Sequence, residues 1–131
     1  MRKRWAHRLR VLEALAWLTL AAVAVRATPF HRLAGGDGGG ANASTADLRR
    51  GFEVAAAVRR AARLSPQRFR CLAQALAARA MLRRRGLSGR LHLSAGRGAD
   101  GIEAHAWLSL GDAVVLGRGA PPGQVELARF D

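Results

Sequence analysis

Apolar and polar side chains alternate along residues 102–110, and this period of two predicts a β-strand with two different faces. The apolar face consists of Ile102, Ala104, Ala106, Leu108 and Leu110, and the mixed face of Glu103, His105, Trp107 and Ser109. A lone histidine on such a strand is ordinarily a structural residue. His105 therefore becomes a candidate for chemistry only if the chain offers a second reactive side chain.

Two further strands flank this one in the sequence. LHLSA at 91–95 alternates in the same way, and GRGADG at 96–101 predicts a loop before the strand that carries His105. Gly111 and Asp112 then predict a turn into AVVL, residues 113–116. Because short connections of this kind join antiparallel neighbours, the second half of the chain predicts a small antiparallel sheet.

A helix is predicted before this sheet and carries the only cysteine in the chain, Cys71. Ser65 and Pro66 are typical of a helix start, strong helix formers follow, and Gly86 ends the segment. Cys71 would then lie in the opening turns, where the partial positive charge of the helix N-terminus favours the nucleophilic thiolate. The alternative interpretation is that Cys71 is a small buried hydrophobic residue.

The amino-terminal segment predicts another helix. Basic residues at 2–10 precede an uncharged apolar run at 14–25, which spans about 18 Å as a helix and is shorter than the ~20 residues that a bilayer requires. A signal peptide has a similar outline, but Glu13 at the head of the run argues against one. We expect a helix that packs on the core, docks on a partner or lies on a membrane surface.

The glycine-rich stretch at 35–45 predicts a flexible linker. After it, Asp47 is expected to cap a helix that runs through Arg63. We therefore divide the chain into a basic and hydrophobic helical segment at 1–34, the linker at 35–45, and a folded domain at 46–131.

Composition adds an excess of positive charge. The 131 residues include 22 lysines and arginines, all but Lys3 being arginine, against nine acids, so that the net charge is +13. Such a balance favours an anionic partner, whether a nucleic acid, a lipid headgroup or an acidic peptide. Few aromatic residues lie between the arginines, and no zinc-ligand or RNA-recognition pattern accompanies them, so a nucleic-acid partner is not expected.

The order of these features, a cysteine at a helix N-terminus, two strands and a histidine on the second, resembles papain-like and transglutaminase-like cores. The run from CLAQALAARAMLRRRG through LHLSAG to AHAWLSLGDAVVLG is similar to the transglutaminase-like leader peptidases of lasso-peptide biosynthesis, the stand-alone B-type protein. The resemblance is strongest over residues 65–118. It extends to the amino-terminal segment through RVLEALAWL and TPFHRLA.

The resemblance implies a fold, a reaction and a set of partners. The fold is an α+β one, with helices followed by a small antiparallel sheet, and 46–131 is its peptidase domain. Cys71 is the nucleophile and His105 the general base of a cysteine peptidase, which needs no cofactor and no metal. The substrate is a ribosomally synthesised precursor peptide, cut between leader and core. The partners are a leader-recognition protein and an ATP-dependent macrolactam synthetase.

The third member of the catalytic site is left open by the sequence. The family's prototypes place an aspartate on the strand after the histidine, whereas this chain has VVLGRG, with Gly117 and Arg118 in that position. Asp112 lies at the turn, and the strand from 105 to 110 already spans about 17 Å, so it is not expected to reach the ring. Glu103 is closer along the same face. Other candidates are Glu126 and Asp131 for the acid, and Gln67 with the backbone N–H of Cys71 for the oxyanion.

Two other function classes stay open beside the peptidase. A Cys/His acyltransferase of the same superfamily would pass the acyl group to an amine, and a non-catalytic basic adaptor would keep only the fold. One cysteine allows no internal disulfide, which favours a reducing compartment. We therefore expect a cytoplasmic protein, with contact of the amino-terminal helix to a membrane surface as an open alternative.

Overall fold

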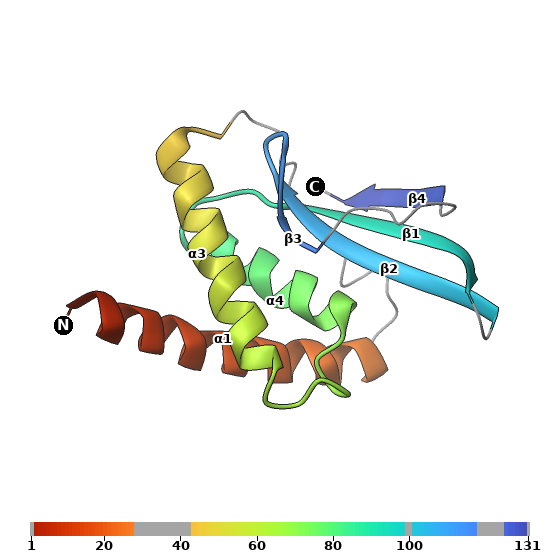
Figure 1. Cartoon of the computed structure of the whole chain (residues 1–131), viewed down its shortest axis with the longest axis horizontal. Helices are drawn as coiled ribbons and strands as arrows, with labels where there is room; N and C mark the ends of the chain where they lie inside the picture. Colours follow the sequence, from red (N-terminus) through yellow and green to blue (C-terminus); the bar gives the residue numbers. More distant parts are fainter. Residues whose placement is uncertain (1, 28–42, 99–100, 118–124, 131) are drawn as a thin grey trace.

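The structure is a computed structural model that describes residues 2–27, 43–98, 101–117 and 125–130. In these ranges three helices are followed by four strands (Figure 1). The helices are α1 (Arg2–Ala27), α3 (Thr45–Ala62) and α4 (Cys71–Arg84), and the strands are β1 (Arg90–Gly98), β2 (Gly101–Leu110), β3 (Ala113–Leu116) and β4 (Val125–Phe130). The expected α+β fold, with helices first and then an antiparallel sheet, is confirmed.

The strands form one antiparallel sheet in the order β3-β2-β1-β4. β1 and β2 pair without a register shift from Arg90 opposite Ser109 to Gly98 opposite Gly101. One expectation was wrong here. Residues 96–101 are not all loop, because β1 continues to Gly98 and β2 begins at Gly101. β4 is an element that the sequence analysis did not address.

The two faces predicted for β2 are the faces observed. Ala106, Leu108 and Leu110 are buried in the hydrophobic core, which the helices share. The side chains of Ile102 and Ala104 lie outside the described residues. Trp107 and Ser109 are also buried, although they point away from that core. Both faces of β2 are thus covered along this part of the strand.

The helices form a layer on one side of the sheet, with α4 against β1 and β2, and α3 against β3 (Figure 1). Small side chains let this layer approach closely. Gly51 of α3 is the tightest point, since a Cβ there would lie 3.0 Å from the Leu110 side chain. α4 contributes a row of buried alanines together with Met81 and Leu82.

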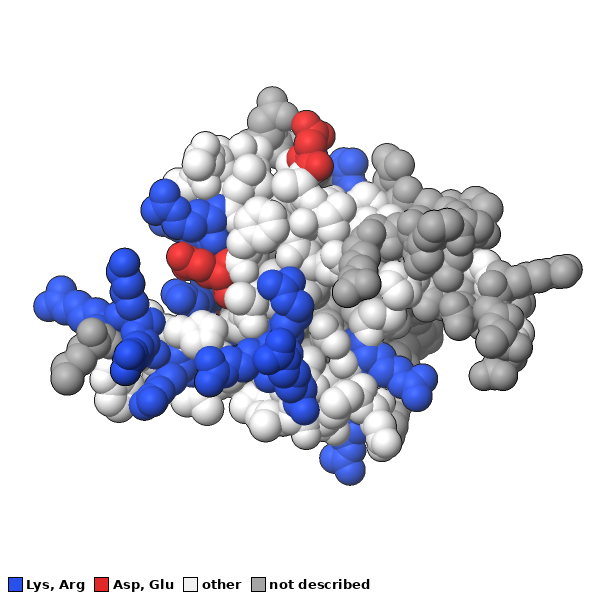
Figure 2. Space-filling view, viewed as in Figure 1, with Lys and Arg blue, Asp and Glu red and all other residues white. Residues whose placement is uncertain are grey.

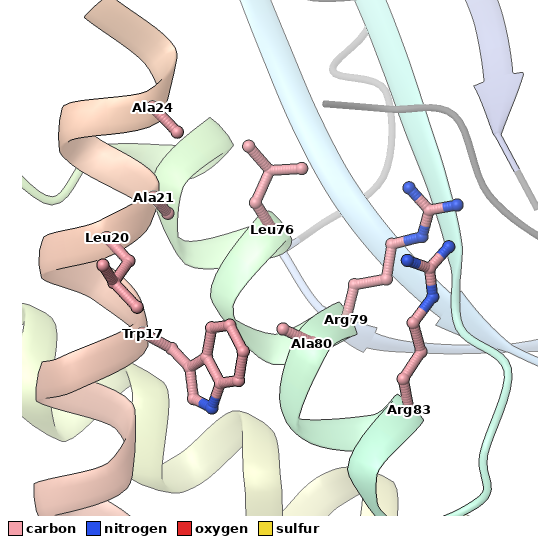
Figure 3. A pocket seen from close by; sticks show the side chains of 8 residues that line it. All are labelled: Trp17, Leu20, Ala21, Ala24, Leu76, Arg79, Ala80 and Arg83. Atoms are coloured by element: carbon pink, nitrogen blue, oxygen red, sulfur yellow. The ribbon is translucent and has the colours of Figure 1, made fainter. Parts of the chain in front are cut away.

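α1 packs against both α3 and α4, so the amino-terminal helix shares the common core. Ala14, Leu18 and Ala21 form its buried face. Figure 3 shows Trp17 extending from α1 toward Ala80 of α4 at the rim of a hollow of about 210 Å³. The helix begins before the apolar run and continues past it, and no helix in the described ranges combines the length and apolar character that crossing a membrane requires.

The start of α3 corrects the expected cap. Ser44 is the N-cap, its hydroxyl accepts a hydrogen bond from the Asp47 backbone N–H at 3.1 Å, and the Asp47 carboxylate accepts one from the Ser44 N–H at 3.1 Å. This reciprocal capping box satisfies two backbone donors. Asp47 is therefore the third residue of the helix and not its cap. Of the expected linker, residues 35–42 lie outside the described residues, and Thr45 is the first residue of α3.

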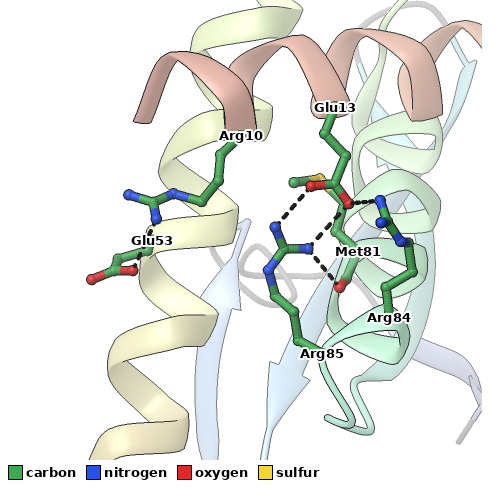
Figure 4. Close-up of polar contacts among 6 residues, drawn as sticks. All are labelled: Arg10, Glu13, Glu53, Met81, Arg84 and Arg85. Atoms are coloured by element: carbon green, nitrogen blue, oxygen red, sulfur yellow. Dashed lines mark hydrogen bonds and ion pairs between the residues drawn. The ribbon is translucent and has the colours of Figure 1, made fainter. Parts of the chain in front are cut away.

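A cluster of charged side chains ties α1 to the carboxyl-terminal end of α4 (Figure 4). The Glu13 carboxylate accepts hydrogen bonds from Arg85 at 2.7 and 3.1 Å and from Arg84 at 2.6 Å, and Arg85 also donates to the Met81 carbonyl at 3.0 Å. Only 17% of the Glu13 side chain is exposed. The hydrogen bond from Arg85, followed by the charges of Arg85 and Arg84, lowers the pKa of Glu13 despite the opposing effect of burial.

Replacing this carboxylate tests how firmly α1 is held. We expect Glu13→Gln to lower the free energy of unfolding at pH 7 by about 1–2 kcal/mol, because charge-assisted hydrogen bonds become neutral ones. Since the folded pKa is lowered, the contribution is present above the ordinary carboxyl range and is lost as the pH falls through the lowered pKa. Urea unfolding at pH 7 and at acidic pH measures both effects.

The matched control is Glu53→Gln. Glu53 pairs with Arg10 at 3.5 Å, and 45% of its side chain is exposed, so this pair contributes little. Equal losses in the two variants, or a loss for Glu13→Gln that does not shrink at acidic pH, would contradict the role given to the Glu13 cluster.

Candidate active site

Cys71 is the first residue of α4 and is half-buried. The helix begins later than the sequence predicts, because residues 65–69 form a separate turn in which the Arg68 and Phe69 N–H groups donate to the Ser65 carbonyl at 3.1 and 2.9 Å. Arg70 is then extended, with φ −77° and ψ 177°, and serves as the N-cap. Ser65 is thus not the cap of α4. The thiol lies one to two turns closer to the helix start than expected.

The start of α4 carries no side-chain cap and no acidic residue in its first turn. The first backbone N–H groups of a helix have no partner within the helix, and they give this end a partial positive charge. The side chain of Cys71 is attached at this end, where helix N–H groups can donate hydrogen bonds to the oxyanion of a tetrahedral intermediate. The position of Cys71 at the first residue of α4 supports its proposed role as nucleophile better than the predicted position farther along the helix.

Gln74 holds the segment that leads into the helix. Its side-chain Nε2 donates to the Phe69 carbonyl at 2.8 Å, and its backbone N–H donates to the Arg70 carbonyl at 2.9 Å. Phe69 is itself buried. Gln74 therefore fixes the turn on which Cys71 depends. The sequence analysis missed this residue, and its only signal was a polar side chain among alanines and leucines on the helix.

Cys71 separates two hollows in the surface. The first, of about 470 Å³, is lined by Ala22, Gln67, Arg68, Arg70, Cys71, Leu72 and Ala73. The second, of about 450 Å³, is lined by Arg59, Ala62, Arg63, Pro66, Phe69, Arg70, Cys71 and Gln74. Gln67, the candidate oxyanion donor, therefore shares the first hollow with the thiol. An extended peptide that crosses Cys71 would have space on either side of the sulfur.

His105 lies on β2 and is half-buried. Its side chain is on the strand face of Trp107, whereas α4 packs on the face of Ala106 and Leu108. Among the residues described, His105 lines neither of the hollows next to Cys71. The structure therefore does not bring the two residues into one hollow, and their catalytic pairing stays a prediction.

The strand face of His105 carries a buried polar cluster that the sequence analysis did not predict. His92 of β1 stacks in parallel on Trp107, with ring centroids 5.1 Å apart and an interplanar angle of 4°, and its Nε2 is 2.7 Å from the Ser109 Oγ. Ser94 is the register partner of His105 and is buried. The alternation of LHLS was the available signal, since it places His92 and Ser94 on one face.

The structure gives the position of some candidate orienting acids but not of others. Asp112 is exposed in the turn beyond the end of β2, which agrees with the distance argument against it. The side chain of Glu103 lies outside the described residues, as do Arg118 and Asp131. Glu126 is placed by its backbone alone, opposite Ser94, which pairs on its other side with His105. The third member of the site therefore stays open among Glu103, Asp112, Glu126 and Asp131.

Gly117 lies where the resemblance to the leader peptidases led us to expect an aspartate. Its φ is +87°, and a Cβ there would lie 2.6 Å from the Trp107 Cβ. Both the left-handed backbone and the contact exclude a side chain unless the strand shifts. The close packing of this segment against β2 thus leaves no room for an aspartate side chain at residue 117.

Asp112 provides a test of this placement. We expect Asp112→Ala to lower the rate of cleavage only a few-fold, whereas loss of a true orienting carboxylate costs about 10⁴ in the serine-protease case. Glu103→Gln and Glu126→Gln, measured in the same steady-state assay, serve as companions. A loss of several thousand-fold in Asp112→Ala alone would show that β2 bends enough to bring the turn to the ring.

In the described parts of the chain, no three His, Cys, Asp or Glu side chains gather closely enough to hold a metal ion.

Helices lead into an antiparallel sheet, with a cysteine at the first residue of a helix and a histidine on a later strand. These features are shared by cysteine-based acyl-transfer enzymes. A model of the transglutaminase-like superfamily matches residues 9–129, which include most of α1, Cys71 and His105. The chain belongs to the transglutaminase-like superfamily. This superfamily includes cysteine peptidases and acyltransferases. No curated protein and no solved structure matches the chain.

Proposed function

We propose that this protein is a cysteine peptidase that removes the leader from a ribosomally synthesised lasso precursor peptide. The observation that carries the proposal is the position of Cys71, at the uncapped start of α4 and between two hollows that can receive the two sides of a peptide. Membership of the transglutaminase-like superfamily supports cysteine-based chemistry. The leader-peptidase assignment rests on the resemblance of residues 65–118.

The proposed reaction begins when the Cys71 thiol loses its proton and the thiolate attacks the carbonyl at the end of the leader. His105 is the base that the sequence predicts, and this role requires its ring to reach the face of the sheet on which α4 packs. The backbone N–H of Cys71 and the side chain of Gln67 stabilise the oxyanion. Collapse breaks the peptide bond, His105 returns the proton to the departing amine of the core, and the leader stays on Cys71 as a thioester. Water activated by His105 then releases the leader acid.

The acceptor distinguishes the two enzyme classes that remain. A peptidase passes the thioester to water, whereas an acyltransferase passes it to an amine. Mass spectrometry of the products formed from a precursor peptide, with and without added amine, separates them. Release of the leader as a free acid in the presence of amine supports the peptidase, and an amide product supports the acyltransferase. The absence of any product with the recognition protein present would support the adaptor.

We assign the recognition of the leader to a second protein, as the resemblance to the leader peptidases implies. α1 offers a surface for this protein. Five large apolar side chains lie on it at helical spacing, opposite the face that Ala14, Leu18 and Ala21 bury. They are Trp5, Leu9, Leu12, Leu20 and Val23, each about 60% exposed, and we call them the α1 stripe.

A second protein that holds the leader raises the local concentration of the scissile bond, to around millimolar for short flexible tethers. We therefore expect slow or absent cleavage of the precursor by this chain alone, and at least a tenfold gain when the recognition protein is added. The macrolactam synthetase would then close the freed core. Turnover of the precursor with and without the recognition protein measures the gain.

The α1 stripe must be tested by surface substitution, because deletion of α1 would uncover Leu18 and remove Glu13 from its arginines. Leu9→Gln combined with Leu12→Gln should abolish most of the stimulation while leaving the unfolding transition in place. Phe52→Gln, at an exposed apolar position on α3, is the control. Full activity without the partner would refute partner dependence, and undiminished stimulation of the double variant would exclude the α1 stripe as the docking site.

A further inference from the structure

The surface around Cys71 carries arginines that no part of the proposed reaction uses. Arg59, Arg63 and Arg70 line one of the two hollows, and Arg68 and Arg70 line the other. All four side chains are exposed. Arg70 is common to both hollows and directly precedes Cys71. A peptide lying across the thiol would meet a guanidinium group on each side of the bond to be cut.

These guanidinium groups have no carboxylate of their own within the described part of the chain. No acidic residue lines either hollow, and the arginines that do form ion pairs there are Arg10, Arg84 and Arg85. Figure 2 shows basic side chains gathered along α1 and over the lower end of α3, from which the chain leads to Cys71. Within the described residues, therefore, no acid neutralises the positive charge beside Cys71.

Each hollow also has an apolar part. Phe69, which is buried, and Ala62 line one, and Leu72 and Ala73 line the other together with Ala22 of α1. An acidic side chain fits such a site, because its methylene groups can lie on apolar surface while its carboxylate receives paired hydrogen bonds from a guanidinium group. A phosphate backbone would find few aromatic faces on which bases could stack.

We propose that the two hollows beside Cys71 bind acidic side chains on both sides of the scissile bond, so that the substrate is an acidic peptide segment. This inference rests on the proposed function and specifies the substrate of the same site. Exposed ion pairs contribute little individually and are screened by salt. The preference is therefore one of several-fold for each acid, and it weakens as ionic strength rises.

The test measures binding, so that it does not depend on turnover. The probe is a short fluorescent peptide with glutamates on both sides of a central Ala–Gly bond, and its counterpart carries glutamines instead. Both are titrated into full-length Cys71→Ala protein, which retains all four arginines. At low salt we expect the acidic peptide to bind about tenfold more tightly, and at high salt the two affinities should converge.

Matched substitutions show whether the hollows are responsible. Adding Arg59→Gln and Arg68→Gln, one in each hollow, should reduce the preference to less than about twofold. Adding Arg4→Gln and Arg49→Gln removes the same charge from exposed positions outside both hollows and should leave the preference unchanged. Equal affinities for the two peptides, or a preference that both double variants retain, would overturn the proposal.

Two further outcomes distinguish this proposal from a phosphate-binding site and from failure of the peptidase assignment. An oligonucleotide that binds more tightly than the acidic peptide, and loses its binding with Arg59→Gln and Arg68→Gln, would assign the hollows to phosphate and overturn the acidic-peptide proposal. A wrong peptidase assignment would give a different set of results. In that case the acidic preference is present and depends on the two arginines, but the unsubstituted chain leaves the bound precursor uncut even with the recognition protein.

Discussion

Cys71→Ala is expected to abolish cleavage of the precursor and to leave the fold intact. Alanine is the best helix former, and this substitution removes only the sulfur from a half-buried side chain at the start of α4. No other residue in the chain can form a thioester, because Cys71 is the only cysteine. Circular dichroism and steady-state turnover, measured on the same preparation, check both halves of this expectation.

His105→Ala should lower turnover nearly as far, since the nucleophile and its base act as a unit and their losses do not add. His7→Ala is the matched control, because His7 lies on α1 beside Arg60, at 3.4 Å between ring and guanidinium nitrogens, and has no part in the reaction. Unchanged turnover in Cys71→Ala or His105→Ala would exclude the pair. An unfolded Cys71→Ala would favour the interpretation of Cys71 as a core residue.

The second large effect concerns Gly117. We expect Gly117→Ala to lower the free energy of unfolding by about 2–4 kcal/mol, because a Cβ meets the Trp107 Cβ at 2.6 Å in addition to the cost of a left-handed backbone. Gly117→Asp should be no better and should not restore a catalytic acid. Urea unfolding measures the losses.

A substitution at Gly86 distinguishes the backbone cost from the steric contact. Its φ is +75°, and no heavy atom lies within 4 Å of a Cβ built there, so Gly86→Ala reports the backbone cost alone, about 1 kcal/mol. A loss at Gly117 no larger than that at Gly86 would show that β3 can move away from Trp107, and the aspartate position would then be open to a side chain.

The regular parts of the fold could be predicted from the sequence because their signals are local. The alternation along β2 places Ala106, Leu108 and Leu110 in the core, and the burial of these residues confirms it. β1 was recognised as a strand in the same way, and β3 from the Gly111–Asp112 turn that precedes it. Elements that depend on contacts with distant residues were not recognised. β4 (VELARF) is an example, because it forms a strand by pairing with β1.

The start of α4 could not be predicted for a related reason. Ser65 and Pro66 carry a genuine start signal, but they open a single turn, and the extended Arg70 then interrupts the helix. What holds this break is the contact of Gln74 with the Phe69 carbonyl and the burial of Phe69 against the helices. Propensity scales do not include such tertiary contacts.

The features of the candidate site likewise divide into those with local sequence signals and those that depend on distant contacts. The sequence predicts Cys71 as the nucleophile in the opening turns of a helix, and the structure places it at the first residue of a helix that begins later. The sequence did not identify the hollows beside the thiol, which arise where α1, the end of α3 and the turn before α4 meet. Nor did it identify the stack of His92 on Trp107, which exists only because β1 and β2 pair in this register.

The most direct test of the account is covalent labelling of Cys71 by a substrate mimic. A leader peptide that ends in a vinyl sulfone in place of the scissile carbonyl would form a stable thioether with the nucleophile, whatever the rate of the later hydrolysis. With the recognition protein present, we predict a single adduct that peptide mapping places on Cys71, and much slower labelling of His105→Ala. Cleavage of the precursor by a chain that the mimic does not label at Cys71, or the absence of both labelling and cleavage, would contradict the account.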